Sequence, residues 1–224
     1  MAVLTRNRPT SRLASIRIDL PPPIGVILAM SLELSARAAE IVAHTKLLLA
    51  EGGYHGFSYA DVSERVRIGK PSIHHHFPTK AELVLTVVVR HREEALAGLA
   101  ALDQHVADPV ERLTAYTDYW AKCIREGSAS MCICAMLAAE TPMIPQEVAA
   151  EVRAYFKDLT AWLASVLEAG ATAGQLQLRD SAQVEAQAFM STVHGAMLTA
   201  RAFNDPKAFA AITQAAIRQM AVPA

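Results

Sequence analysis

The sequence predicts an all-α fold of about nine helices. Of its 224 residues, 52% are hydrophobic but only 6% are aromatic, and this composition favours packed helices over a β-sandwich. Helix caps and apolar residues at helical spacing recur along the chain, whereas no segment shows the alternation typical of a strand. We expect a leader over residues 1–34, a small domain over residues 35–80 and a larger helical domain over residues 81–224.

The small domain has the layout of one helix followed by two short helices across a tight turn. The first helix is expected over Ser35–Ala50, before two glycines that end it. Ser58 is a good N-cap for the second helix, which should reach Val66. Gly69 can take the backbone conformation that a tight turn demands. Pro71 suits the first turn of the third helix, where its missing N–H would be unpaired anyway.

The third helix is expected to be apolar on one face and polar on the other. Ile73 and Phe77 should point into the small domain. The side chains expected to face outward are Lys70, Ser72, His74 and His75. Two short helices across a glycine-containing turn, the second polar and basic on its outer face, are typical of a reader of the DNA major groove. The sequence therefore predicts double-stranded DNA as a partner.

The same segment resembles the N-terminal domain of the TetR family of bacterial transcription regulators. The features that carry the resemblance are Ser58, Val62-Ser63, Arg67-Ile68-Gly69, Ile73–Phe77 and Lys80–Leu83. Pro71 and His74 depart from the family's pattern, in which Gly and Tyr are more usual, and Arg67-Ile68-Gly69 replaces the commoner Gly-Val-Ser. The resemblance is specific over residues 35–90 and architectural beyond them. It implies a helix-turn-helix DNA-binding domain joined to a helical ligand-binding and dimerisation domain.

Candidate DNA contacts follow from the helix-turn-helix. Lys70 and Lys80 are expected to anchor phosphates, with Ser58 and Tyr59 touching the DNA backbone near the start of the second helix. The candidates for base edges or nearby phosphates are Ser72, His74 and His75. The alternative is that these are merely solvated residues of a small helix.

Three consecutive histidines, His74–His76, invite a metal-site interpretation. Adjacent helical residues point about 100° apart, so three in a row do not converge on one ion. We therefore expect no metal here and no cofactor elsewhere, and we expect His76 to turn inward.

Charge and cysteine content limit the class of protein. Residues 35–92 hold eight Lys/Arg against five Asp/Glu, whereas residues 93–224 hold nine against fifteen, as expected of a phosphate-binding head on an acidic body. Three cysteines without a secretory leader favour a reducing cytoplasm over a disulfide scaffold. No apolar run approaches the roughly 20 residues of a membrane span. Residues 1–34 are expected to be disordered or to precede the real start, with a basic DNA-binding arm as the alternative.

The last two helices, expected over Ser181–Phe203 and Asp205–Met220, are rich in small residues. Small side chains let helix backbones approach closely, and the resemblance implies that these helices form a homodimer. The alternative is ordinary packing within one subunit.

The resemblance also implies a pocket for a small apolar or reactive effector in the larger domain. Its candidate lining is Tyr116, Tyr119, Trp120, Cys123, Cys132, Met136, Trp162, Phe189 and His194. Aromatic and methionine side chains at helical spacing are also typical of plain core.

Cys132 has a second interpretation. It is expected in the first turn of a short helix, where the helix dipole stabilises a thiolate, so it is a candidate redox or electrophile sensor. The alternative is a small buried hydrophobic residue. Cys132 and Cys134 are expected to point to different faces of that helix. An all-helical enzyme is the least favoured hypothesis, because Glu140, His194 and Cys132 match no catalytic spacing.

Overall fold

The structure, a computed structural model, describes residues 34–222, so expectations about the leader lie outside the described residues. The described part holds nine α-helices and a 3-10 turn, η1 (Thr141–Met143), and its extended pairing is one isolated bridge between Leu176 and Ala221. The all-α prediction is therefore confirmed. The helices are α1 Ala36–Gly52, α2 Tyr59–Val66, α3 Lys70–His76, α4 Lys80–His105, α5 Pro109–Glu126, α6 Ile133–Ala139, α7 Gln146–Thr172, α8 Ala182–Phe203 and α9 Pro206–Met220.

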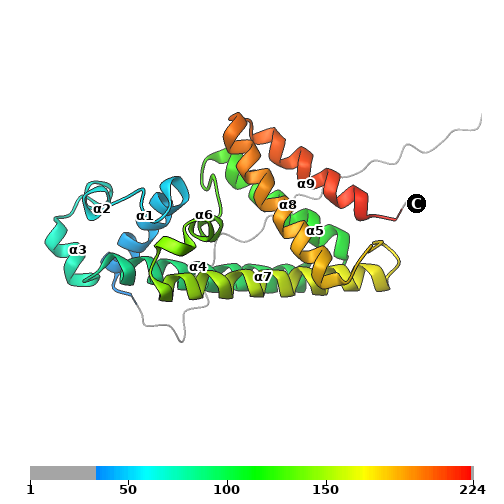
Figure 1. Ribbon diagram of the computed structural model, residues 1–224, viewed down its shortest axis with the longest axis horizontal. Helices are drawn as coiled ribbons and strands as arrows, with labels where there is room; N and C mark the ends of the chain where they lie inside the picture. Colours follow the sequence, from blue (N-terminus) through cyan, green and yellow to red (C-terminus); the bar gives the residue numbers. More distant parts are fainter. Residues whose placement is uncertain (1–33, 223–224) are drawn as a thin grey trace, which may run out of the picture. The chain divides into compact units, whose positions relative to one another are not determined.

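Helices α1, α2 and α3 form the head of the unit Ser35–Ala224 (Figure 1). The Ser58 hydroxyl accepts a hydrogen bond from the backbone of α2. In turn, the Ser58 N–H donates to the Asp61 carboxylate, which completes a capping box. Ile73 and Phe77 are buried, as predicted, and fix α3 against the rest of the head. Burial of these two side chains therefore fixes the orientation of α3, so that its opposite face points to solvent.

The turn between α2 and α3 differs from the prediction. Gly69 has φ −68° and ψ 147° and serves as the N-cap of α3, so the prediction that it forms the tight turn is wrong. The left-handed residue is Arg67, with φ 57° and ψ 43°. Helix α2 ends at Val66, and the N–H groups of Arg67 and Ile68 both donate to the Ser63 carbonyl. The chain has thus already turned before Gly69 is reached.

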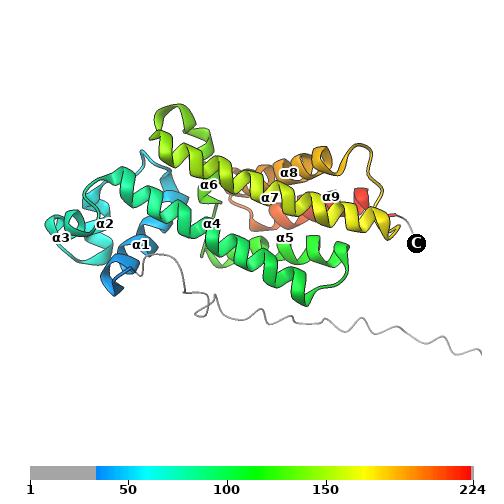
Figure 2. The ribbon, with the colours of Figure 1, turned by 90° about the horizontal axis from the view of Figure 1, so that it is seen from below.

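Helix α4 belongs to both the head and the body, the second of which also contains α5 to α9. Its first half buries Leu83, Val84, Val87 and Val88, and it packs against α1 and, further along, against α7. Helices α4 and α7 lie side by side (Figures 1 and 2). The expected boundary at residue 80 therefore falls at the start of one continuous helix rather than in a linker.

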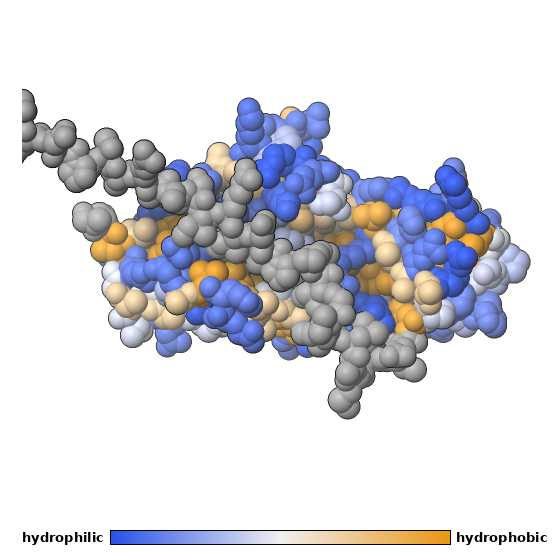
Figure 3. All heavy atoms as spheres, turned by 180° about the vertical axis from the view of Figure 1, so that it is seen from behind, coloured by the Kyte–Doolittle hydropathy of each residue, from blue (hydrophilic) through white to orange (hydrophobic). Residues whose placement is uncertain are grey.

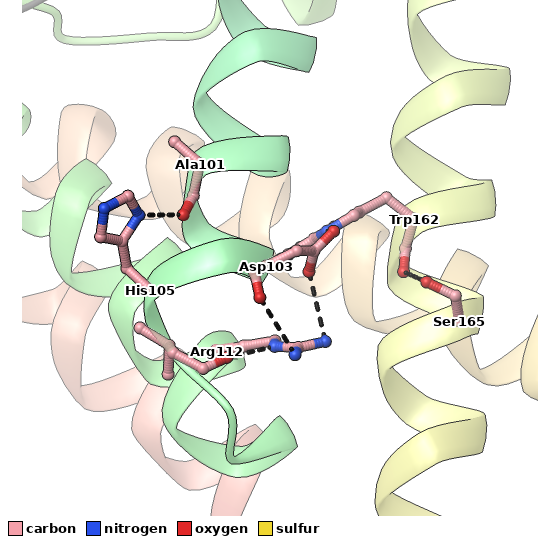
Figure 4. Close-up of polar contacts among 7 residues, drawn as sticks. Ala101, Asp103, His105, Arg112, Trp162 and Ser165 are labelled. Carbon is pink, nitrogen blue, oxygen red and sulfur yellow. Dashed lines mark hydrogen bonds and ion pairs between the residues drawn. The ribbon is translucent and has the colours of Figure 1, made fainter.

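Ion pairs and hydrogen bonds fix α4 to the body at two levels. Arg92 pairs with Glu151 at 2.9 Å and with Asp158 at 2.6 Å, both on α7. Near the end of α4, Asp103 accepts from the Trp162 indole at 3.0 Å and pairs with Arg112 at 3.3 Å (Figure 4). These contacts lock α4, α5 and α7 together.

The remaining core of the body is apolar. Helix α7 buries Leu159, Leu163, Val166 and Leu167, and α8 packs against both α7 and α9. No helix of residues 34–222 is both long enough and apolar enough to cross a bilayer. Figure 3 shows the molecule from behind, with hydrophilic residues interrupted by smaller apolar patches.

Candidate nucleic-acid interface and effector site

The outer face of α3 carries most of the predicted DNA contacts. Lys70, Ser72, His74 and His75 are all exposed, while His76 is half-buried and stacks edge-on against His75 at 5.4 Å. Within the described part of the chain, no three His, Cys, Asp or Glu residues are placed to hold a metal ion. The structure therefore offers this face as a polar and basic surface backed by an apolar core.

His74 and Tyr59 form a fixed pair at the end of this face. Their rings lie 4.6 Å apart, and His74 Nδ1 lies 3.2 Å from the Pro78 carbonyl oxygen. The Tyr59 hydroxyl donates to the Phe77 carbonyl at 2.8 Å. Burial, with Glu82 nearby, raises the pKa of Tyr59 to about 12, so the phenol remains neutral and able to donate. Both side chains are thus held by α3 and its C-terminal turn.

Lys80 lies differently from the expectation. The prediction that it anchors a phosphate assumed a free ammonium, whereas its Nζ donates to the Phe57 carbonyl. The ammonium also lies 4.7 Å from the ring centre of Tyr54 and 4.2 Å from that of Phe57. Burial lowers the pKa of Lys80, and the charges of Glu140 and Asp61 oppose this effect. Lys80 therefore holds the segment before α2 against α4.

A shallow surface pocket of about 270 Å³ brings part of the predicted interface together. It is lined by Phe57, Ser58, Tyr59, His74 and Lys80. Four predicted contact residues therefore meet at the start of α2, while Lys70, Ser72 and His75 lie outside this pocket on α3.

The C-terminal end of α1 is held by two charged side chains of the body, which we call the α1 clamp: Glu140 and Arg201. Glu140, the C-cap of α6, accepts from the Tyr54 N–H at 2.6 Å and from the His55 N–H at 3.2 Å. Arg201 of α8 donates to the carbonyls of Ala50 and Glu51. No sequence pattern predicts this clamp, because its partners are 85 or more residues apart.

Gly53 is required at the centre of the clamp. Its φ is +72°, and a Cβ there would lie 2.4 Å from a Glu140 carboxylate oxygen. The glycine that was expected only to end α1 therefore also lets the carboxylate approach the backbone.

Most of the predicted effector-site residues lie inside the body. Those that are buried are Tyr116, Trp120, Cys132, Trp162 and Phe189, and His194 is half-buried.

Three predicted pocket residues lie elsewhere. Tyr119 is 53% exposed, because it is about 60° around α5 from the buried Tyr116 and about 100° from the buried Trp120. Its prediction as a pocket residue is therefore wrong. Cys123 is half-buried beside Tyr119, and Met136 lies near the clamp, where its sulfur is 3.6 Å from an Arg201 nitrogen.

Polar side chains from four helices surround Cys132. Its sulfur lies 3.6 Å from the hydroxyl of Tyr155, and the His91 ring stacks on Tyr155 with ring centres 5.3 Å apart. We call the group Cys132, His91, Tyr116, Tyr155 and His194 the Cys132 cluster; its members come from α4, α5, α7, α8 and the N-cap of α6. Hydrogen bonding with Cys134, helped by His194 and His91, lowers the pKa of the Cys132 thiol against the opposing effect of burial.

The two neighbouring thiols are closer than predicted. Cys132 has an extended backbone, with φ −66° and ψ 125°, because it is the N-cap of α6 rather than a residue within the helix. The helical separation expected between Cys132 and Cys134 therefore does not apply, and their thiols interact, each remaining free of a disulfide.

Three polar atoms of the Cys132 cluster make no hydrogen bond within the described chain: His91 Nε2, His194 Nε2 and the Tyr116 hydroxyl. Buried polar groups are almost always paired, because leaving one unpaired costs about 1–3 kcal/mol. His91 was not among the predicted site residues; its place in the fourth turn of α4, on a face otherwise apolar, was the available signal.

A cavity of about 140 Å³ lies between α8 and α9 and includes Phe189 in its lining. Cys132 itself is fully buried. A ligand would therefore reach the Cys132 cluster only after the surrounding helices open.

The α1 clamp predicts a stability difference between two glutamates. Glu140→Ala leaves the N–H groups of Tyr54 and His55 without their carboxylate partner and should lower the free energy of unfolding by about 1–3 kcal/mol. Glu126→Ala removes an exposed carboxylate at the end of α5 and should change it by less than about 0.5 kcal/mol. Chemical denaturation followed by circular dichroism measures both, and equal effects would contradict the clamp.

Comparison with known proteins agrees with this architecture. Residues 41–87 match the model of the bacterial regulatory proteins of the tetR family, and residues 109–216 match that of the tetracyclin repressor-like C-terminal domain. A TetR-family transcriptional regulator from Agrobacterium tumefaciens is 46% identical, with a TM-score of 0.81 over 83% of this chain and 98% of that one. A TetR regulator from Legionella pneumophila shares the fold at 23% identity, with a TM-score of 0.74 over 84% of this chain and 100% of that one.

A curated relative, the HTH-type transcriptional activator FasR of Mycolicibacterium smegmatis, is 27% identical over 79 residues. That match spans 35% of this chain and 36% of the relative. The family models and the Agrobacterium structure cover both the head and the body. The chain therefore belongs to the TetR family of DNA-binding transcription regulators.

Proposed function

We propose that the protein is a homodimeric repressor that occupies a palindromic operator and leaves it when a small effector binds in the body. The observation that carries this proposal is the outer face of α3, which is polar and basic and is held outward by the burial of Ile73 and Phe77. A recognition helix of this kind enters the major groove with its N-terminal residues near the base edges. Lys70 is the first residue of α3, so its ammonium supports this orientation. The site of action is proposed to be the cytoplasm.

Dimerisation is proposed through an uncharged row along α8. Val184 and Leu198 are 47% and 59% exposed, and the residues between them on the same face are Ala188, Ser191 and Gly195. Not all of the small residues of α8 belong to this row, because Ala186, Ala196 and Ala200 are buried within the subunit. Exposed apolar residues flanked by small ones favour close contact between two α8 helices. Two subunits would place their α3 helices about 34–36 Å apart.

The effector is proposed to act at the Cys132 cluster. The unpaired nitrogens of His91 and His194 and the Tyr116 hydroxyl could bond a polar group of an otherwise apolar or aromatic molecule. Helices α6 and α8 each hold one member of this cluster and one member of the α1 clamp. Opening the cluster would therefore move α6 and α8 against the end of α1, alongside any movement of α4, and shift the population of head positions.

A second candidate function is supported by the environment of Cys132. Two imidazoles and a second thiol stabilise its thiolate, and the thiolate is the nucleophilic form of cysteine. The sulfur could add to the β-carbon of a small unsaturated carbonyl compound, whose α-carbon then takes up a proton. The added bulk in a fully buried site would force the helices apart.

DNA binding is tested by selecting genomic fragments with the purified protein. We expect retention of a few fragments, with affinity that falls steeply as salt rises, because phosphate contacts release counterions. Lys70→Ala should weaken binding to all retained fragments alike, whereas Lys122→Ala, an exposed lysine of α5, should not. Failure to retain any fragment in a salt-dependent way would contradict the proposed function.

The cysteine alternative is tested with N-ethylmaleimide on the protein–DNA complex. If Cys132 is the sensor, the reagent should release wild-type protein and Cys123→Ser from DNA but should leave Cys132→Ser bound. Cys123 is the suitable control because it is more accessible than Cys132 and lies outside the Cys132 cluster. Equal release of all three proteins would rule out Cys132 as the sensor.

A further inference from the structure

Arg67 occupies a backbone conformation that an arginine disfavours. Its φ of 57° is in the left-handed region, and Arg67 and Asn204 are the two non-glycine residues with positive φ in the described chain. The position after a helix end that takes this conformation is usually glycine, because a Cβ is strained there. Asparagine tolerates it better than arginine. Arg67 is therefore the more unexpected of the two.

The turn itself does not need an arginine side chain. The Ser63 carbonyl accepts from the N–H groups of Arg67 and Ile68, and the Ser63 hydroxyl donates to the Ile68 carbonyl. All three bonds involve only the backbone of Arg67 and Ile68. A glycine at position 67 would keep each of these bonds without the strain. The reason for an arginine must lie in what its side chain contacts outside this turn.

Arg67 also stands out among the positively charged side chains of the head. Arg37 pairs with Glu40 at 2.5 Å, and the other cations that are engaged are Lys46 with Glu94, Arg65 with Glu51 and Lys80 with the Phe57 carbonyl. Among residues 35–80 as the structure describes them, the two Lys/Arg side chains left without a partner are Arg67 and Lys70. Both are exposed, and they bracket the loop that leads into α3. The free positive charge of the head is thus concentrated at the start of the recognition helix.

We propose that Arg67 is a DNA-contacting residue whose guanidinium binds a backbone phosphate beside the groove that α3 enters, next to the contact made by Lys70. This inference rests on the proposed DNA binding and adds a positioning residue to it. Guanidinium binds phosphate through two parallel hydrogen bonds, which fixes orientation as well as adding affinity. Backbone strain that the surrounding structure holds in place is found most often at functional sites. The arginine sets the register of the head on the duplex without reading its sequence.

Arg67→Gly separates stability from binding in the full-length protein. Relief of the strain should raise the melting temperature by about 2–4 °C. Binding to a selected fragment and to unrelated DNA should weaken equally, by about eightfold for each subunit at roughly 0.1 M salt. The slope of the logarithm of the binding constant against the logarithm of the salt concentration should become shallower by about 0.9 for each lost contact. Arg67→Lys, which keeps the charge, should retain most of the salt slope.

The matched control is Asn204→Gly, which relieves the other left-handed residue, at the end of α8. It should leave DNA affinity and its salt dependence unchanged. An Arg67→Gly protein that melts higher but binds DNA like wild type would overturn the inference, and so would one that melts lower, since the arginine would then be holding the turn. Absence of DNA binding by wild-type protein would instead contradict the proposed function itself.

Discussion

The contact of Glu140 and Arg201 with the end of α1 is the interaction on which the packing of the head against the body depends. The last carbonyls of a helix and the N–H groups of the turn after it have no partners within the helix. Here Arg201 bonds the carbonyls, and Glu140 bonds the N–H groups of Tyr54 and His55. Two side chains of opposite charge, from two helices of the body, thus complete a helix of the head. The head is therefore joined to the body by more than the shared α4.

The same two helices also carry the buried polar centre. Cys132 caps the start of α6 and Glu140 its end, while His194 and Arg201 lie two turns apart on one face of α8. A rearrangement around Cys132 would therefore displace the clamp residue Glu140 through α6, which is seven residues long. His91 extends the centre to α4, which runs directly into the head. The unpaired polar atoms of this cluster carry a free-energy cost that the apolar core around it does not.

Local signals in the sequence predicted the helices well and the contacts between them poorly. Ser35, Ser58 and Thr79 cap helices as expected, because capping depends on a few neighbouring residues. The contacts of Lys80 and Glu140 were not predicted, because their partners lie 23 and 85 or more residues away and no local pattern indicates such contacts. The turn at Arg67–Gly69 was placed correctly, but the left-handed conformation was expected at Gly69, because glycine adopts it at least cost, whereas Arg67 adopts it. The proximity of Cys132 and Cys134 was missed because α6 begins at Ile133, after Cys132, so Cys132 does not have the helical backbone that was expected of it.

In the proposed dimer, two copies of α3 meet consecutive turns of one duplex. The most direct measurement is a hydroxyl-radical footprint of the protein on a fragment that it selects from genomic DNA. A dimer of this kind should protect two half-sites related by symmetry, with centres separated by about 10–10.5 base pairs or a whole multiple of that distance. A single protected half-site, or two at a separation that is not a whole number of helical turns, would contradict it.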